Sequence, residues 1–181
     1  MPISAANPIQ FWVICCEETE VTQEVARTVD SWQLAGVRSL IGDRQALLST
    51  VDTITNTSYV IFVTPDNQPA SQAKVQPLNI LQLPESESES VGEKSAVDMM
   101  TSALKRHGRT PQSWLLQLPT TEVRAQYVQS VPADKSVAQA IAAIEVFVRN
   151  YARATPFATP AQTPAKAQPE REVMLSHYRR I

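Results

Sequence analysis

Short apolar runs alternate with segments of helical spacing between residues 9 and 151, and this alternation constrains the fold more than any other feature. The run IQFWVICC (9–16) lies between a proline and a charged cluster, as a central strand buried on both faces would. VRSLI (37–41) and the β-branched, aromatic run YVIFV (59–63) predict two more strands. Strands that alternate with helices form a mostly parallel sheet covered on both faces.

Helical spacing fills the gaps between these runs. After Thr19, valines recur at positions 21, 25 and 29, and Gly36 follows as a C-cap residue would. The spacing predicts further helices over about 44–54, 94–107 and 134–151.

Two additional segments complete the expected sheet. SWLLQL (113–118) predicts a strand, and KVQPL (74–78) predicts a weaker one, which Pro77 would confine to an edge because proline lacks the N–H that a central strand donates. The chain has 181 residues, of which 43% are hydrophobic, enough for one domain with its own core. We therefore predict an α/β three-layer sandwich with a mostly parallel five-stranded sheet flanked by helices.

Composition changes sharply at Ala154. Residues 154–169 are rich in Pro, Ala and Thr, which is typical of an extended, flexible linker. This linker would join a domain at 1–153 to a short C-terminal segment. The last segment, 170–181, forms an apolar stripe if it is helical. We expect this stripe to bind a protein partner as a short amphipathic docking peptide. The residues of the stripe are Val173, Met174, His177, Tyr178 and Ile181.

Charge and hydropathy exclude two classes of partner. The formal net charge is −2 and no basic block occurs, so the sequence offers no surface for nucleic-acid phosphates. No apolar run approaches the roughly 18 residues that a membrane span requires.

Cys15 and Cys16 are adjacent on a strand and point to opposite faces, so a disulfide between them is not expected. These features predict a cytoplasmic protein, and none of them indicates an oligomeric state.

Several side chains are candidates for metal binding, nucleophilic catalysis or phosphorylation. Cys15 and Cys16 stand where the first strand ends, a position suited to a metal pair or a nucleophile, but free cysteines are more often buried in the core. Glu17, Glu18 and Glu20 would bind a hard cation or simply begin a helix, where acids complement the dipole. Of the three, Glu20 is the candidate ligand. The stretch ESESES (85–90) is a loop or a phosphorylation target.

The order and content of the elements resemble a known family. VARTVDSWQLAGVRSL (25–40), YVIFVTPDNQPASQAKVQPL (59–78) and MMTSALKRHGRTPQSWLLQLP (99–119) resemble the corresponding parts of the hydrogenase maturation endopeptidases. These are small α/β proteins that clip the C-terminal tail of the large subunit of nickel-containing hydrogenases. The resemblance covers residues 9–152 and implies the same α/β fold, without the linker and the end peptide.

The metal-recognition positions of that family are altered in this chain. Active members contact the nickel of the large subunit through an acidic residue in a glycine-rich loop after the first strand, an aspartate after the third strand and a histidine before the third helix. Here the loop reads CCEETEV, without glycine and about five residues shorter, and Thr64 follows VIFV. SVGEKSAVD (90–98) contains no histidine. Asp66 stands two residues past the expected aspartate and is, with Glu20, the remaining candidate ligand.

The combined losses predict a pseudo-protease without catalytic residues, metal or cofactor. We expect a protein-binding adaptor or assembly factor that uses the domain surface for one partner and the end peptide for another. Its layout is similar to that of cargo proteins targeted to bacterial microcompartments. The alternative is a divergent metal-dependent endopeptidase that matures a hydrogenase large subunit. A nucleotide-binding domain is less compatible, since no glycine-rich phosphate loop follows the first strand.

Overall fold

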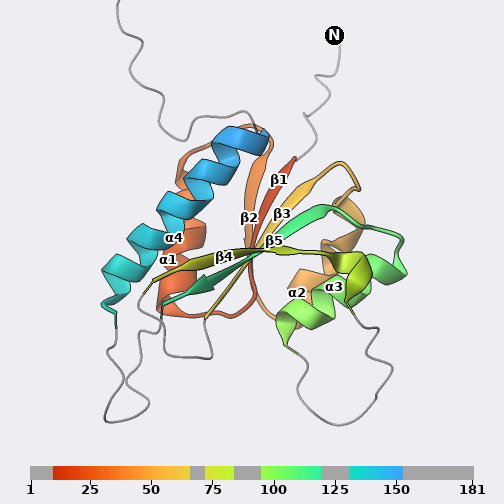
Figure 1. Cartoon of the computed structure of the whole chain (residues 1–181), viewed down its shortest axis with the longest axis horizontal. Coiled ribbons are helices and arrows are strands. Elements are labelled where there is room, and N and C mark those ends of the chain that lie inside the picture. Colours follow the sequence, from red (N-terminus) through yellow and green to blue (C-terminus); the bar gives the residue numbers. More distant parts are fainter. Residues whose placement is uncertain (1–9, 66–71, 84–94, 120–130, 153–181) are drawn as a thin grey trace, which may run out of the picture.

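The structure is a computed structural model that describes residues 10–65, 72–83, 95–119 and 131–152. Strands and helices alternate as the sequence predicts (Figure 1). The strands are β1 (Phe11–Cys15), β2 (Val37–Ile41), β3 (Tyr59–Pro65), β4 (Lys74–Leu78) and β5 (Gln112–Leu118). The helices are α1 (Glu20–Ser31), α2 (Arg44–Ser49), α3 (Ala96–Arg106) and α4 (Ala133–Phe147). Short 3₁₀ turns η1 (Val51–Thr53) and η2 (Ile80–Gln82) and a π-helical turn η3 (Val148–Ala152) complete the described elements.

The five strands form one sheet in the order β2-β1-β3-β5-β4. β1, β2, β3 and β5 are parallel, and β4 pairs antiparallel with β5 at the edge. Pro77 lies opposite Trp114 in this pair. The prediction that Pro77 marks an edge strand is confirmed, because only one side of β4 has to supply hydrogen bonds.

Helices cover both faces of the sheet: α1 and α4 lie on one side, and α2 and α3 on the other (Figure 1). Phe11, Val13 and Cys15 of β1 belong to the core under α1 and α4. Trp12, Ile14 and Cys16 belong to the core on the side of α2 and α3. All six residues are buried, so the unbroken apolar run of the sequence reflects burial on both faces. The predicted three-layer α/β architecture is confirmed.

α1 begins at a capping box. The backbone N–H of Thr22 donates to the Thr19 hydroxyl at 3.2 Å, and the N–H of Thr19 donates to the Thr22 hydroxyl at 2.8 Å. The helix ends earlier than a Gly36 cap implies: Gln33, with φ of 50°, is the first left-handed residue. Gly36 instead forms a second left-handed turn, and its carbonyl accepts hydrogen bonds from Gln10 and Phe11 at the start of β1.

α2 is shorter than the predicted 44–54 helix. It ends at Ser49 and passes into η1, and Ile54 is already extended. The hydroxyls of Ser49, Thr50 and Thr53 each donate to the carbonyl three residues earlier, at 2.6–2.7 Å. Such local bonds compete with a regular helix, which is the physical reason for its early end.

Other boundaries agree with the sequence to within about three residues. α3 begins at Ala96, with Ser95 as its N-cap, and Gly108 follows its end with φ of 66°. The predicted 134–151 helix corresponds to α4 followed by the wider turn η3. None of the helices in the described ranges is long and apolar enough to span a membrane. The linker at 154–169, the segment 170–181 and the Ser/Glu stretch lie outside the described residues, so their assignments stay predictions.

Candidate functional site

A hollow of about 500 Å³ opens at the carboxyl ends of the parallel strands, where ligand sites of α/β proteins gather. The segment after β1, the end of β3, one face of β4 and β5, Leu83 and the start of α3 line it. The lining residues are Glu17, Thr64, Pro65, Lys74, Gln76, Leu78, Leu83, Ser95, Val97, Asp98, Leu115 and Gln117.

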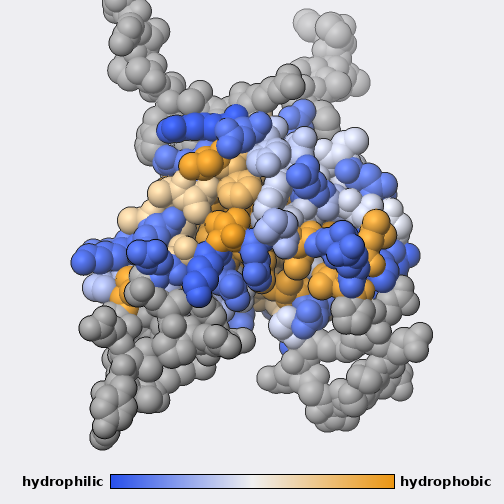
Figure 2. Space-filling view, viewed as in Figure 1, coloured by the Kyte–Doolittle hydropathy of each residue, from blue (hydrophilic) through white to orange (hydrophobic). Residues whose placement is uncertain are grey.

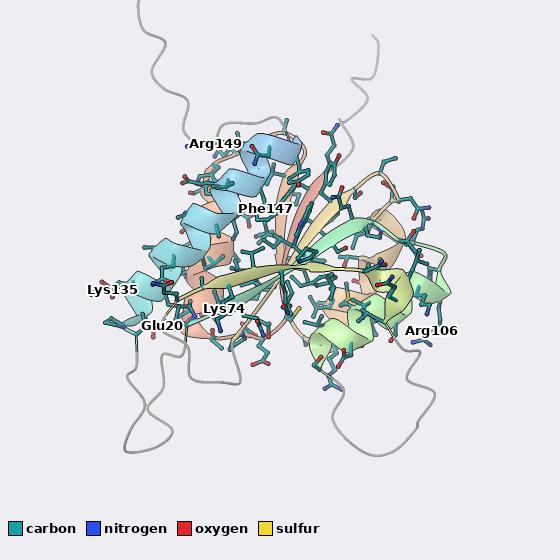
Figure 3. The ribbon with its side chains drawn as sticks, viewed as in Figure 1. Glu20, Lys74, Arg106, Lys135, Phe147 and Arg149 are labelled. Atoms are coloured by element: carbon teal, nitrogen blue, oxygen red, sulfur yellow. The ribbon has the colours of Figure 1, made fainter. Side chains whose placement is uncertain are left out.

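The register of β4 and β5 places polar side chains in this hollow. Lys74 stands opposite Gln117, and Gln76 stands opposite Leu115. Directly opposite residues of an antiparallel pair point to the same face of the sheet. Residues 74–77 are exposed, so the helices on this face leave β4 open to solvent. In Figure 3, Lys74 lies at the same end of the molecule as Glu20, which begins α1.

Three charged groups surround the hollow: the carboxylates of Glu17 and Asp98 and the ammonium group of Lys74. Asp98 accepts a hydrogen bond from the Ser95 hydroxyl at 2.7 Å, which orients it at the first turn of α3. The carbonyl of Glu17 accepts from the Thr22 hydroxyl at 2.6 Å, which fixes the backbone between β1 and α1. Mixed charges beside amide side chains suit a polar or peptide ligand better than a single ion.

The two cysteines lie next to the hollow but point away from it into the two cores. Burial, together with the charge of Asp30, raises the pKa of the Cys15 thiol to about 12. Burial also raises the pKa of Cys16, with smaller contributions from Cys15 and Glu17. A thiolate is the nucleophile and the metal ligand, so both thiols are unsuited to either role at neutral pH.

The candidate residues predicted from the sequence that the structure describes do not come together in this hollow. Glu20 is exposed at the start of α1 and is not among the residues that line the hollow, whereas Glu17 lines it. Asp66 and the stripe residues Val173, Met174, His177, Tyr178 and Ile181 lie outside the described residues. The sequence reading missed Lys74, Gln76 and Gln117. For Lys74 and Gln76 the signal was the alternation of side chains within KVQPL, which becomes informative once the strand partner is known.

The donor set does not fit a metal site. Within the described parts of the chain, no three His, Cys, Asp or Glu residues come together in a way that could hold a metal ion. Thr64, the next-to-last residue of β3, occupies the position where the resemblance implies an aspartate, and a neutral hydroxyl is a weak substitute for a carboxylate. His107 follows the last residue of α3, with its Nδ1 atom 3.0 Å from Oδ1 of Asp52. The first turn of α3, which lines the hollow, is at the opposite end of that helix.

Two solved structures share this architecture. The hydrogenase-maturing endopeptidase HybD from E. coli superposes with a TM-score of 0.53 at 11% identity, covering 78% of this chain and 93% of that chain. The solution structure of an endopeptidase from Escherichia coli gives a TM-score of 0.50 at 15% identity, with the same coverage. No protein-family model matches the sequence. No curated protein matches it either. The likeness confirms the predicted fold, that of the hydrogenase-maturing endopeptidases.

Proposed function

We propose that this domain, which has the fold of the hydrogenase-maturing endopeptidases, is a non-catalytic adaptor or assembly factor that binds proteins. One partner binds at the hollow between β4 and α3, and a second binds residues 170–181. The assembly of a large complex such as a microcompartment is a setting that suits two such sites. The observation that carries the proposal is the composition of the hollow: Thr64 stands where the resemblance implies an aspartate, and the ammonium group of Lys74 lines the same hollow.

The chemistry of these side chains favours binding over cleavage. A threonine hydroxyl keeps its proton at neutral pH, and the lysine ammonium adds positive charge that opposes a cation. Lys74 and the amides of Gln76 and Gln117 can instead hydrogen-bond carboxylates and peptide groups. The hollow therefore retains recognition groups and lacks a metal-ligand set among its described residues.

The exposed edge strand supports a peptide ligand. Among the described strands, β4 pairs with β5 on one side only, so its outer edge offers backbone groups to an extended segment. Addition of a strand to a sheet edge is a common mode of peptide recognition, in which alternate side chains enter pockets. Pro77 interrupts this edge and limits pairing to the part near Lys74, which is also where the hollow lies.

A divergent endopeptidase is the second candidate, and one observation favours it. The carboxylates of Glu17 and Asp98 line the same hollow and would supply two ligands to a divalent cation. Thermal unfolding with added Ni²⁺ or Zn²⁺ separates the two functions, because a cation bound to the native state raises its stability. The adaptor predicts no shift. A rise that Glu17→Gln abolishes, together with shortening of a hydrogenase large subunit by mass spectrometry, would establish the endopeptidase.

Affinity recovery from the native host tests the adaptor directly. Three baits are compared: the full chain, the chain ending at Arg153, and the full chain with Gln76→Arg, which fills the hollow with a large cation. Gln45→Arg, at an exposed position on α2, is the matched control. The adaptor predicts that truncation and Gln76→Arg each remove a different partner. Retention of every partner by both variants would refute it.

A further inference from the structure

A second, smaller hollow lies at the opposite end of β4 and β5. It has a volume of about 290 Å³ and is formed by the end of β4, by η2 and by the turn that enters β5. Its apolar lining includes Pro77, Ile80, Leu81 and Pro111. Among the residues that the structure describes, those that line it are all uncharged, in contrast to the hollow beside Glu17. We call this second hollow the η2 groove.

The η2 groove exposes apolar surface that folding alone does not cover. Leu81 is 64% exposed, the largest value among the bulky apolar side chains of the described residues. Figure 2 shows apolar residues among hydrophilic ones on the side of the molecule where η2 lies. An exposed leucine on its own needs no explanation, but one that borders an uncharged groove marks a surface that gains from being covered.

The described structure ends at the same end of the strands as this groove. Because α4 runs antiparallel to the parallel strands, η3 lies at the end of the sheet where those strands begin (Figure 1). There the Tyr151 ring lies 4.6 Å from the Trp114 ring and 5.1 Å from the Tyr59 ring, centroid to centroid. Trp114 itself lines the groove, as does Gln112, the partner of Tyr59 in the sheet.

We propose that the η2 groove binds residues 170–181 of the same chain. The linker at 154–169 spans roughly 50 Å if extended, which is long enough for residues 170–181 to reach the groove from the last described turn. An intramolecular ligand also has a high effective concentration, of order millimolar for a short flexible tether. The uncharged walls match the predicted apolar stripe of Met174, Tyr178 and Ile181, which the charged hollow does not.

This proposal rests on the proposed function, in which residues 170–181 are a docking peptide. It adds that the same peptide binds its own domain. The same stripe would then cover the groove or bind a partner, but not both at once. A partner has to compete with the groove for the segment, which lowers its apparent affinity by the fraction of chains in which the segment is free.

Limited trypsin digestion of the full-length protein tests this proposal. Cleavage after Arg179 reports on the end segment, and cleavage after Lys166 in the linker is the internal reference. Docking predicts that Leu81→Asp speeds cleavage after Arg179 by about tenfold relative to Lys166, because the site must be free to be cut. Leu48→Asp, at a leucine that is 40% exposed on α2, should leave the ratio unchanged.

The remaining outcomes are equally decisive. Unchanged digestion with Leu81→Asp, in a protein with the circular dichroism of the natural chain, overturns the proposal. A cleavage ratio that rises on tenfold dilution of the natural chain also overturns it, since a segment held by a second copy is released on dilution whereas one held in cis is not. Failure of the adaptor function would appear separately, as unchanged partner recovery after truncation at Arg153.

Discussion

Cys15 Sγ lies 3.6 Å from the carbonyl oxygen of Thr22, so the last residue of β1 contacts the first turn of α1. Both residues are fully buried. In an α/β enzyme this junction often holds catalytic groups. Here it is packed as core, and the polar groups that face solvent at this end belong to Glu17 and to the neighbouring strands.

The buried thiols predict a loss of stability at high pH. The pKa of Cys15 is raised from 9.0 to about 12, so the folded state holds this proton more tightly than the unfolded state does. This contribution to the free energy of unfolding is fully present below pH 9 and declines as the pH rises from 9 toward 12. Urea unfolding at pH 8, 9.5 and 10.5 measures the decline, which Cys15→Ala should reduce.

The same thiols should resist modification in the folded protein. At pH 8 a thiol reagent such as DTNB is expected to react with neither Cys15 nor Cys16 until urea unfolds the chain, when both react. Rapid reaction of either thiol in the native protein would show an accessible thiolate. It would contradict the prediction and favour a nucleophilic role for a cysteine at the end of β1.

Thr22→Val should destabilise the protein by about 1–3 kcal/mol. The Thr22 hydroxyl donates to the Glu17 carbonyl and accepts from the Thr19 N–H, and valine keeps the shape but removes both bonds. Thr28→Val is the control, because the Thr28 hydroxyl only donates to the Glu24 carbonyl within the same helix. Chemical denaturation of both variants gives the comparison, and equal losses would contradict the capping role.

Trp114→Ala should cost about 3–5 kcal/mol, the range for large aromatic residues removed from a core. Trp114 is 6% exposed, and its ring contacts those of Tyr59, Phe147 and Tyr151. This cluster joins β3 and β5 to α4 and η3. Val146→Ala, at a residue 54% exposed on α4, should change the unfolding free energy little in the same titration.

Gln139→Met should loosen the start of β4 without unfolding the domain. Gln139 Oε1 accepts a hydrogen bond from the Ala73 N–H at 2.7 Å, which ties the residue before Lys74 to α4. Methionine fills the space but accepts only weakly, so amide exchange at Ala73 should become faster. Hydrogen exchange read by NMR gives the rate, with Gln45→Met on α2 as the control. No change at Ala73 would mean that other contacts hold β4.

The sequence by itself determined the element order, the sheet of five strands and the edge position of β4. These follow from local physics: apolar runs buried on both faces, helical spacing, and a proline that cannot donate in a central strand. Local patterns were less informative at helix ends, since the competing hydroxyl bonds of Ser49 and Thr50 shorten α2.

Tertiary structure alone decided the contents of the candidate site. From the sequence we expected Glu20 to be the ligand among Glu17, Glu18 and Glu20, but the path from β1 into α1 brings Glu17 to the hollow. Lys74 enters it because β4 pairs with β5 in a register that sets Lys74 opposite Gln117. Register and loop path depend on packing between segments far apart in the chain, which no local periodicity encodes.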